Sequence, residues 1–289
     1  MSTKPVIVLT GATNGLGRLA AEELAIHGAH LVIIARSNEK ADATKALVDL
    51  VAPGSPCDVF LADLSVMDDV LRVGQEIAAR YERIDVLINN AGIHAFSQRI
   101  TCDGFSEMMA VNYFAPWLLT WTLRDVLIRS GPSRVVNVAS EASRRHGVLT
   151  LPHDLTDTAP FSTLGSSPLY GKTKLFDIMF SQKLAQDLAN TNVTVNAICP
   201  GFNVTGLGRE LWFAGILEGI LRFLQVGDPH RGASLIVHAA VSNELAGKTG
   251  GYYSVDKKPL TPVAPGGDVD LQKKLWNLTE GLLEMWRKV

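Results

Sequence analysis

Short runs of apolar, β-branched residues alternate along this chain with longer segments whose apolar positions recur at helical spacing. The runs predicted to be strands are residues 6–10, 31–36, 58–62, 86–89, 134–139, 194–198 and 250–255. The segments predicted to be helices are residues 17–27, 38–51, 66–81, 105–129, 169–188 and 268–286. The strands are apolar throughout, as expected where helices cover both faces of a sheet. Repeated β-α units therefore predict an α/β fold, a doubly wound parallel sheet with right-handed crossovers.

This alternation runs nearly from end to end without a linker or tandem repeat, so we expect a single domain, residues 1–289. Two segments interrupt it. Residues 141–167 are rich in Pro, Ser, Thr and His, which predicts an irregular insert between a strand and a helix. Residues 202–226 include a strongly apolar run at 211–224. A core-facing helix, a lid over a substrate pocket and a membrane contact are alternative interpretations of that run.

Composition narrows the functional classes. The chain has 289 residues, 47% of them hydrophobic and 19% charged, which is typical of a globular protein with a large core. A net charge of −2 gives no reason to expect nucleic acid or an anionic membrane as a partner. Cys57, Cys102 and Cys199 lack the paired spacing of a zinc site or disulfide framework, so we expect no metal. No signal peptide or bilayer-spanning run is recognised, so we expect a cytoplasmic protein.

A glycine-rich turn directly follows the first predicted strand. Its sequence, Thr10-Gly-Ala-Thr-Asn-Gly-Leu-Gly17, opens the first predicted helix. Glycines at 11, 15 and 17 permit a tight turn and close backbone approach, and a helix N-terminus offers unpaired N–H groups to a pyrophosphate. In this strand–turn–helix context, the turn predicts dinucleotide binding.

The end of the second predicted strand carries Arg36 where an acidic residue would favour a free ribose hydroxyl. A guanidinium engages phosphate with paired donors, and Arg18 beside the glycine turn adds a second positive charge. These residues favour NADP(H) over NAD(H). The alternative is that both arginines are solvated surface residues.

Tyr170 and Lys174 lie four positions apart, near the start of a stretch, residues 175–188, that is typical of an amphipathic helix. This spacing places both side chains on one helical face. An ammonium beside a phenol stabilises the phenolate, so we expect the pKa of Tyr170 to fall toward neutrality. Tyr170 would then serve as a proton donor and acceptor.

Several further landmarks occur in order with these motifs. They are Asp63-Leu64, Asn89-Asn-Ala-Gly92, Asn112, Val136-Asn-Val-Ala-Ser140, Tyr170-x-x-x-Lys174 and Pro200-Gly201. Together with the glycine turn, they resemble the short-chain dehydrogenase/reductase family over essentially the whole chain. The resemblance implies a Rossmann-like fold and an oxidoreductase that moves hydride between a nicotinamide and a carbonyl or alcohol.

The resemblance assigns roles to these positions. Asp63 contacts the adenine, residues 89–92 line the adenosine ribose and stabilise the central sheet, and residues 200, 201 and 205 flank the nicotinamide. Asn203 stands where the family more often has Val or Ile. The full set of predicted cofactor contacts is Gly11, Thr13, Asn14, Gly15, Leu16, Gly17, Arg18, Arg36, Asp63, Leu64, Asn90, Ala91, Gly92, Tyr170, Lys174, Pro200, Gly201 and Thr205.

The resemblance also implies a catalytic tetrad of Asn112, Ser140, Tyr170 and Lys174. Ser140 donates a hydrogen bond to the substrate oxygen. Tyr170 delivers or removes the proton, and Lys174 depresses the tyrosine pKa and holds the nicotinamide ribose. Asn112 anchors a water that links the lysine to solvent.

Ser140 and Tyr170 are thirty positions apart, a longer spacing than most of the family uses. The insert between them, with His153-Asp154-Leu155, resembles retinol dehydrogenases and WW-domain oxidoreductases. We therefore expect a lipophilic ketone, aldehyde or alcohol as substrate, in agreement with the apolar run at 211–224. His94, His146 and His153 have no fixed spacing to a partner, and we interpret them as loop residues rather than pocket residues.

Two other functions use the same fold. The first alternative is a non-catalytic regulator or scaffold that binds the cofactor, and the second is a related lyase or dehalogenase. The complete tetrad disfavours the first alternative, and the intact glycine turn disfavours the second. The family resemblance also suggests a homo-oligomer assembled through residues 105–129 and 169–188.

Overall fold

The structure, a computed structural model, describes residues 4–163, 165–201 and 228–287. Its strands are β1 (Val6–Thr10), β2 (His30–Ala35), β3 (Cys57–Leu61), β4 (Val86–Asn89), β5 (Ser133–Val138), β6 (Val193–Cys199) and β7 (Tyr252–Ser254). They form one sheet in the order β3-β2-β1-β4-β5-β6-β7, and all pairings are parallel. The predicted doubly wound sheet is confirmed, with strand bounds shifted by one or two residues.

The helices follow the predicted alternation with some additions. They are α1 (Gly15–Ile26), α2 (Asn38–Val51), α3 (Met67–Arg80), α4 (Glu107–Met109), α5 (Ala115–Ser130), α6 (His153–Thr156), α7 (Ser166–Asp187), α9 (Pro229–Val241), α10 (Val269–Leu282) and α11 (Glu284–Arg287). The sequence analysis missed α9. Its start carries a usable signal, because Asp228 accepts from the His230 N–H as N-cap and Pro229 occupies the first turn.

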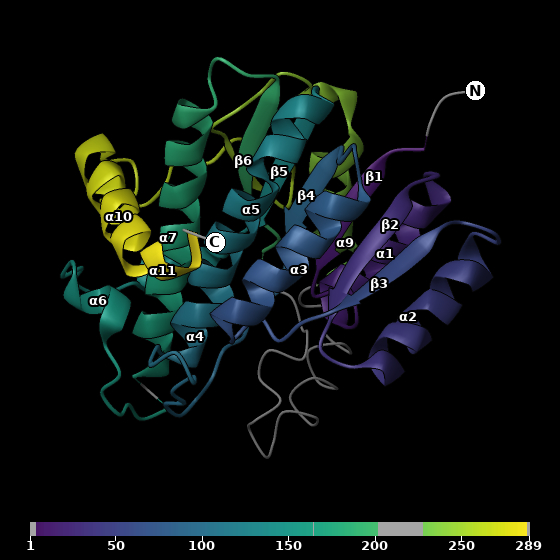
Figure 1. Ribbon diagram of the computed structural model, residues 1–289. Helices are drawn as coiled ribbons and strands as arrows, with labels where there is room; N and C mark the ends of the chain where they lie inside the picture. Colours follow the sequence, from purple (N-terminus) through teal and green to yellow (C-terminus); the bar gives the residue numbers. More distant parts are fainter. Residues whose placement is uncertain (1–3, 164, 202–227, 288–289) are drawn as a thin grey trace.

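Each face of the sheet packs against its own layer of helices (Figure 1). Val8, Val32 and Leu87 point toward the layer of α3, α5 and α7. Their strand neighbours point the opposite way, toward α1, α2 and α9. Because both faces are covered, alternate positions of a strand are equally apolar, which explains the continuous apolar runs.

The segment predicted as one helix over 105–129 is interrupted. A π-helical turn, η1 (Ala110–Phe114), separates α4 from α5 and is centred on Asn112. An α-helical hydrogen bond to the Asn112 carbonyl would require the N–H of residue 116, which is a proline. Pro116 therefore leaves that carbonyl without an α-helical donor, and the local widening of the helix has a cause in the sequence.

Helix α7 is buried on all sides from residue 173 to 181, so the amphipathic pattern predicted for residues 175–188 is wrong over most of its length and holds only near its end, where Gln186 and Asp187 are exposed. On one side α7 packs against β5 and β6, and α10 covers its outer face, where Trp276 stacks on Phe180. The helix that carries Tyr170 is thus fixed between two layers of its own chain, and the α7 surface expected to serve assembly is covered by α10.

The insert at 141–167 is partly helical and is anchored to α7. It begins with a 3-10 turn, η2 (Glu141–Arg145), and contains α6. Asp154 is 3% exposed, accepts from the Thr150 N–H and forms an ion pair with Lys172 on α7. Leu155 inserts into the main core cluster. These contacts tie the insert to the helix of the predicted catalytic tyrosine.

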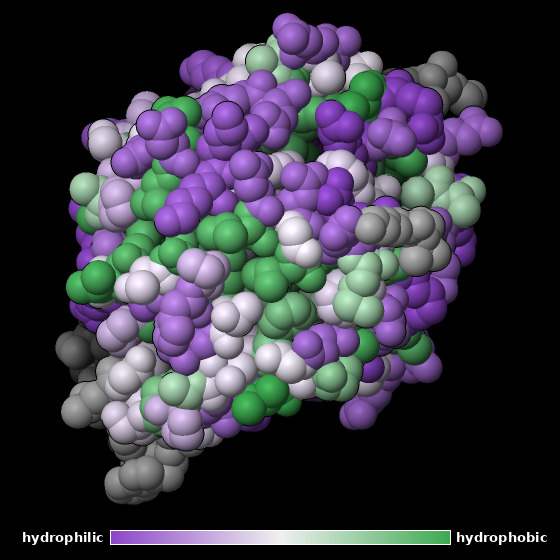
Figure 2. Space-filling view, turned by 60° about the vertical axis from the view of Figure 1, so that its left-hand side comes forward, coloured by the Kyte–Doolittle hydropathy of each residue, from purple (hydrophilic) through white to green (hydrophobic). Residues whose placement is uncertain are grey.

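Apolar side chains gather in the middle of the face that includes α10 (Figure 2). Val148, Val269 and Met285 are the large hydrophobic residues of the insert, α10 and α11 that are most exposed. Within the described ranges, no helix combines the length and apolar character needed to cross a bilayer.

The C-terminal helix α11 provides a test of this packing. Trp286 is 6% exposed, donates to Asp68 Oδ1 at 2.8 Å and packs on Phe105. We expect Trp286→Ala to lower the free energy of unfolding by about 3–5 kcal/mol, because removing the buried ring leaves a cavity. Urea denaturation measures the change. Met285→Ala, at a neighbouring position that is 68% exposed, should change it little. Equal effects of the two substitutions would contradict the packing described.

Candidate active site

A cleft of about 580 Å³ opens at the carboxyl ends of the strands. It lies where the strand order reverses between β1 and β4, the position at which open α/β sheets bind ligands. Its walls include these predicted residues: Gly11, Thr13, Asn14, Gly15, Leu16, Gly17, Arg36, Asp63, Leu64, Asn90, Ala91, Gly92, Ser140, Tyr170, Lys174, Pro200 and Gly201. The structure therefore brings most of the predicted site to one cavity.

The glycine turn forms one end of this cleft. A Cβ on Gly17 would lie 2.2 Å from the Gly11 carbonyl oxygen, and one on Gly11 would lie 2.8 Å from Ala91 Cα. Only glycine permits this close packing. Asn14 caps α1 without a side-chain hydrogen bond, and the first turn of α1 holds no acidic residue. The helix therefore presents uncapped N–H groups and the positive end of its dipole at the cleft.

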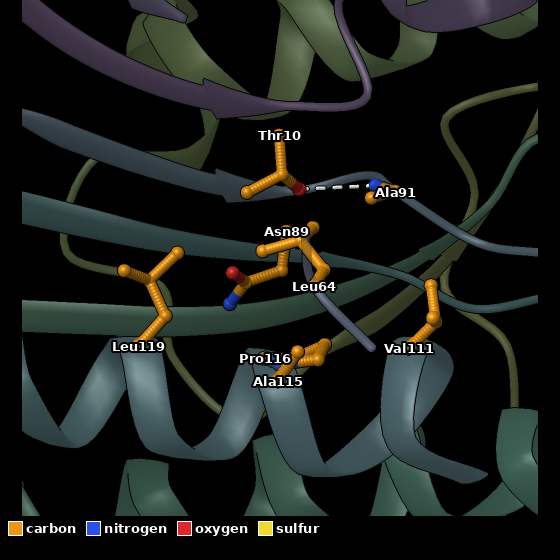
Figure 3. A pocket seen from close by; sticks show the side chains of 8 residues that line it. All are labelled: Thr10, Leu64, Asn89, Ala91, Val111, Ala115, Pro116 and Leu119. Carbon is orange, nitrogen blue, oxygen red and sulfur yellow. Dashed lines mark hydrogen bonds between the residues drawn. The ribbon is translucent and has the colours of Figure 1, made fainter. Parts of the chain in front are cut away.

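The segment after β4 is held against the glycine turn. Asn90 Nδ2 donates to the carbonyls of Thr10 and Gly11 at 3.0 and 3.3 Å. Thr10 Oγ1 accepts from the Ala91 N–H at 3.0 Å, a bond drawn in Figure 3. Behind them a narrow second pocket separates Asn89 from Pro116 and its neighbours on α5 (Figure 3). The Asn89 side chain donates hydrogen bonds to Thr120 Oγ1 and Asn137 Oδ1, which join β4 to α5 and β5.

The opposite wall, after β2, is basic. Arg36 and Lys40 are both exposed and both line the cleft. Arg18 does not line it, because its guanidinium pairs with Glu22 one turn along α1 at 2.6 Å. The second positive charge expected from Arg18 is therefore supplied by Lys40, which the sequence analysis missed. A basic residue four positions after Arg36, in the first turn of α2, was the available signal.

Tyr170 and Lys174 lie one turn apart on α7 and are both buried. Lys174 Nζ donates to the Val138 carbonyl at 2.9 Å and to Asp177 Oδ2 at 2.8 Å. Ser140, which follows β5, forms a side-chain hydrogen bond with Tyr170 and also accepts from the Ala142 N–H. The end of β5 and one face of α7 thus bring Ser140, Tyr170 and Lys174 together at the floor of the cleft.

The electrostatics of Tyr170 differ from the sequence prediction. Burial raises the pKa of Tyr170, while the Lys174 charge and the hydrogen bond with Ser140 lower it. The net direction is upward, so the predicted fall toward neutrality is wrong for the protein alone. Lys174 acts as expected, but desolvation outweighs it. The negative charge of Asp177 also acts to raise the pKa of Tyr170.

Asn112 lies behind the cleft rather than on its wall. Its Oδ1 accepts from the Ile93 N–H at 2.8 Å, and its Nδ2 donates to the Ile93 carbonyl at 2.9 Å and to Thr173 Oγ1 at 3.0 Å. Thr173 in turn donates to the Tyr170 carbonyl. The Asn112 side chain therefore clamps the loop after β4 to α7.

His94 lies in a loop, as predicted, but it also lines the cleft, so the prediction that it is not a pocket residue is wrong. Its ring stacks on the Tyr170 ring, with the ring centroids 4.6 Å apart and the planes at 9°. The centroid of the Phe96 ring also lies 4.6 Å from that of His94, with the planes tilted by 32°. His146 and His153 do lie outside the cleft lining. The available signal was its position, because His94 lies only two residues after the Asn89–Gly92 motif that was predicted to line the cofactor site.

Some predictions fall outside the described residues. The predicted segment 202–226, which includes Asn203 and Thr205, lies there, so its expected contacts with the nicotinamide and the substrate stay predictions. Further lining residues that the sequence analysis did not assign to the site include Ile34, Ala35, Ala62, Ile93, Arg99, Glu107, Val111, Val138 and Ala139.

Comparison with known proteins identifies the family. The short chain dehydrogenase family profile matches residues 5–152 and 158–213. Human retinol dehydrogenase 14 is 32% identical, covering 96% of this chain and 87% of the relative. Human polyprenol dehydrogenase is 31% identical over 94% and 83%. The WW domain-containing oxidoreductase of Danio rerio is 30% identical over 96% and 68%.

Solved structures show the same architecture. A Mycobacterium paratuberculosis protein superposes with a TM-score of 0.75 at 25% identity, over 98% of this chain and 94% of that one. A Beutenbergia cavernae protein with bound NADP gives 0.65 at 25% identity, over 88% and 96%. The chain belongs to the short-chain dehydrogenase family, and it is an oxidoreductase of that family.

The glycine cradle is tested by a substitution. We expect Gly17→Ala to weaken dinucleotide binding strongly, because the added methyl group would lie 2.2 Å from the Gly11 oxygen and 2.4 Å from Asn90 Nδ2. Fluorescence titration with NADPH and NADH measures it. Gly281→Ala on α10 is the control, since nothing lies within 4 Å of its added Cβ. Unchanged affinity in Gly17→Ala would contradict the cradle.

Proposed function

We propose that this protein is an NADP(H)-dependent oxidoreductase acting on a lipophilic carbonyl compound or alcohol. The observation that carries the proposal is the group of Ser140 with the buried Tyr170 and Lys174 on the floor of a cleft with a glycine cradle at one end. Family membership supports the reaction class. The roles of individual residues follow from their positions.

The cleft residues fit a dinucleotide. The uncapped start of α1 and the glycine turn would hold the pyrophosphate. Asp63 would contact the adenine, the segment from Asn90 to Gly92 the adenosine ribose, and Pro200 and Gly201 the nicotinamide. Lys174 uses two of its three donors on Val138 and Asp177, so the third remains for a ribose hydroxyl.

The nicotinamide, when bound, supplies or accepts a hydride. Ser140 donates a hydrogen bond to the substrate oxygen, where negative charge develops. Tyr170 gives its proton to that oxygen in reduction and removes it in oxidation. Lys174 stabilises the phenolate that Tyr170 becomes. Asn112 acts through its main-chain carbonyl as an anchor for a proton-relaying water, since its side chain is used in the clamp.

The surroundings of Tyr170 support a lipophilic substrate. Its ring belongs to a cluster with Ala95 and Met108, against which Ile93 and Phe161 pack. The His94 ring adds a flat surface beside the phenol. Relatives of this chain are named for retinol and polyprenol, both lipophilic alcohols.

Replacing the phenol separates an enzyme from a scaffold. We expect Tyr170→Phe to lower kcat by ~10²–10⁴ because it removes the proton donor, with NADPH affinity nearly unchanged. A screen of lipophilic aldehydes and ketones, followed by loss of NADPH absorbance, supplies the substrate. Tyr253→Phe, a buried tyrosine outside the cleft lining, should retain activity. Full activity in Tyr170→Phe would favour the non-catalytic alternative.

Cofactor preference is tested at the basic wall. We expect Arg36→Asp to weaken NADPH binding by about 10–100-fold and NADH binding far less, because a charged hydrogen bond to the 2′-phosphate is lost. Calorimetric titration of both cofactors gives the ratio. Arg18→Asp makes the same charge change at a residue that pairs with Glu22, and should alter the ratio much less. The NADP assignment fails when wild-type and Arg36→Asp proteins bind both cofactors equally.

Assembly and location complete the proposal. Because α10 covers α7, a homo-oligomer would use another surface. We propose the apolar side chains that gather in the middle of the face that includes α10 (Figure 2). A cytoplasmic location and a membrane contact by residues 202–226 both stay predictions.

A further inference from the structure

Asp177 extends the stripe of α7 that carries the proposed chemistry. Tyr170, Lys174 and Asp177 are spaced by four and three positions, so all three share one helical face. Asp177 is 2% exposed and Lys174 is 3% exposed. The roles proposed above give Asp177 no part, although it touches the ammonium on which they depend.

The carboxylate of Asp177 is committed to a single side chain. Oδ2 accepts from Lys174 Nζ at 2.8 Å, whereas Oδ1 finds no hydrogen-bond partner in the part of the chain that the structure describes. A buried carboxylate with one unsatisfied oxygen costs free energy, and a neutral residue of similar size would avoid part of that cost. The retained charge therefore points to an electrostatic effect on Lys174 and its neighbours.

The two charges act on Tyr170 in opposite directions. The Lys174 ammonium lowers the pKa of Tyr170, and the more distant Asp177 carboxylate raises it. Burial lowers the pKa of Lys174, but the charge and hydrogen bond of Asp177 together with the charge of Tyr170 outweigh this, and the net direction is upward, so the ammonium stays charged. Burial raises the pKa of Asp177 itself to about 6, against the opposing charge of Lys174.

Other titratable groups border this stripe from the packed elements. They are Tyr113 of η1, whose pKa Asp177 helps to raise, Cys199 of β6, which acts on Tyr170, and His94 of the loop after β4, which stacks on Tyr170. None of these three groups is a carboxylate, and in the described part of the chain the carboxylate that forms an ion pair with Lys174 is that of Asp177.

We propose that Asp177 is a positioning residue that holds Lys174 in place, and that its own charge sets the pH at which Tyr170 exchanges its proton. This inference rests on the proposed function, in which Tyr170 is the acid–base group. It assigns to this chain a counter-charge that limits how strongly the lysine acidifies the phenol.

The experiment is the pH dependence of turnover in Asp177→Asn. Without the carboxylate charge, the phenolate of Tyr170 is no longer repelled, and that phenolate itself keeps the neighbouring ammonium of Lys174 charged, so the pKa of Tyr170 falls relative to wild type. Alcohol oxidation, which needs the phenolate, should reach its plateau at lower pH. Carbonyl reduction, which needs the protonated phenol, should lose activity at lower pH. A residue with only a structural role would reduce kcat or stability without moving either limb.

A spectroscopic readout makes the test independent of turnover. The ultraviolet absorbance of tyrosinate is titrated with and without NADP⁺, and the Tyr170→Phe titration is subtracted to isolate Tyr170. The same subtraction in the Asp177→Asn background should give a titration displaced to lower pH. Asp177→Glu keeps the charge and should stay close to wild type. Asp187→Asn, the same change at an exposed aspartate of α7, should have no effect.

The outcomes are distinct. A Tyr170 titration at the same pH in wild type and Asp177→Asn overturns the inference, as does an equal displacement in Asp187→Asn. If Asp177→Asn does not fold, as judged by circular dichroism, Asp177→Ser removes the charge with a smaller side chain and must show the same displacement. A displaced titration in a protein that reduces no carbonyl compound supports the charge coupling while the proposed function fails.

Discussion

A full positive charge lies almost completely buried on the floor of the cleft, and the surrounding structure is arranged to accommodate it. Lys174 reaches the carbonyl at the end of β5 and a carboxylate on its own helix. The carbonyl contact requires α7 to be pressed against the sheet at a fixed height and rotation. The covering of α7 by α10, and the clamp from Asn112 through Thr173, maintain that position. Tyr170 and Ser140 derive their geometry from the same constraint.

Much of the fold was predictable because its signals are local. Strands buried on both faces must be apolar at every position, and seven such runs identified the sheet. The helices were less regular. Pro116 removes an N–H donor and interrupts the helix around Asn112, an effect that an apolar repeat does not reveal. The amphipathic prediction for α7 failed over most of its length because α10, which joins it from the far end of the chain, converts an outer face into an inner one.

The candidate site was also only partly predictable from the sequence, and again the local features were the predictable ones. Glycine spacing and the separation of Tyr170 from Lys174 are set by turn and helix geometry, so their positions followed from the sequence. The direction of the Tyr170 pKa depends on burial, which comes from segments distant in sequence, and it was predicted wrongly. Lys40 and His94 are single residues without a repeating pattern. Their placement in the cleft depends on how α2 and the loop after β4 fold back toward it.

The covering of α7 by α10 has a consequence for biosynthesis. A ribosome releases the chain from its N-terminus, so α7 emerges well before α10 does. During that interval the aromatic surface of Trp117 and Phe180, which Trp276 later contacts, lies bare. Nascent chains with such surfaces are prone to associate with one another. The molecule therefore completes the support of its lysine only once α10 has emerged, and chaperones have an apolar target on it until then.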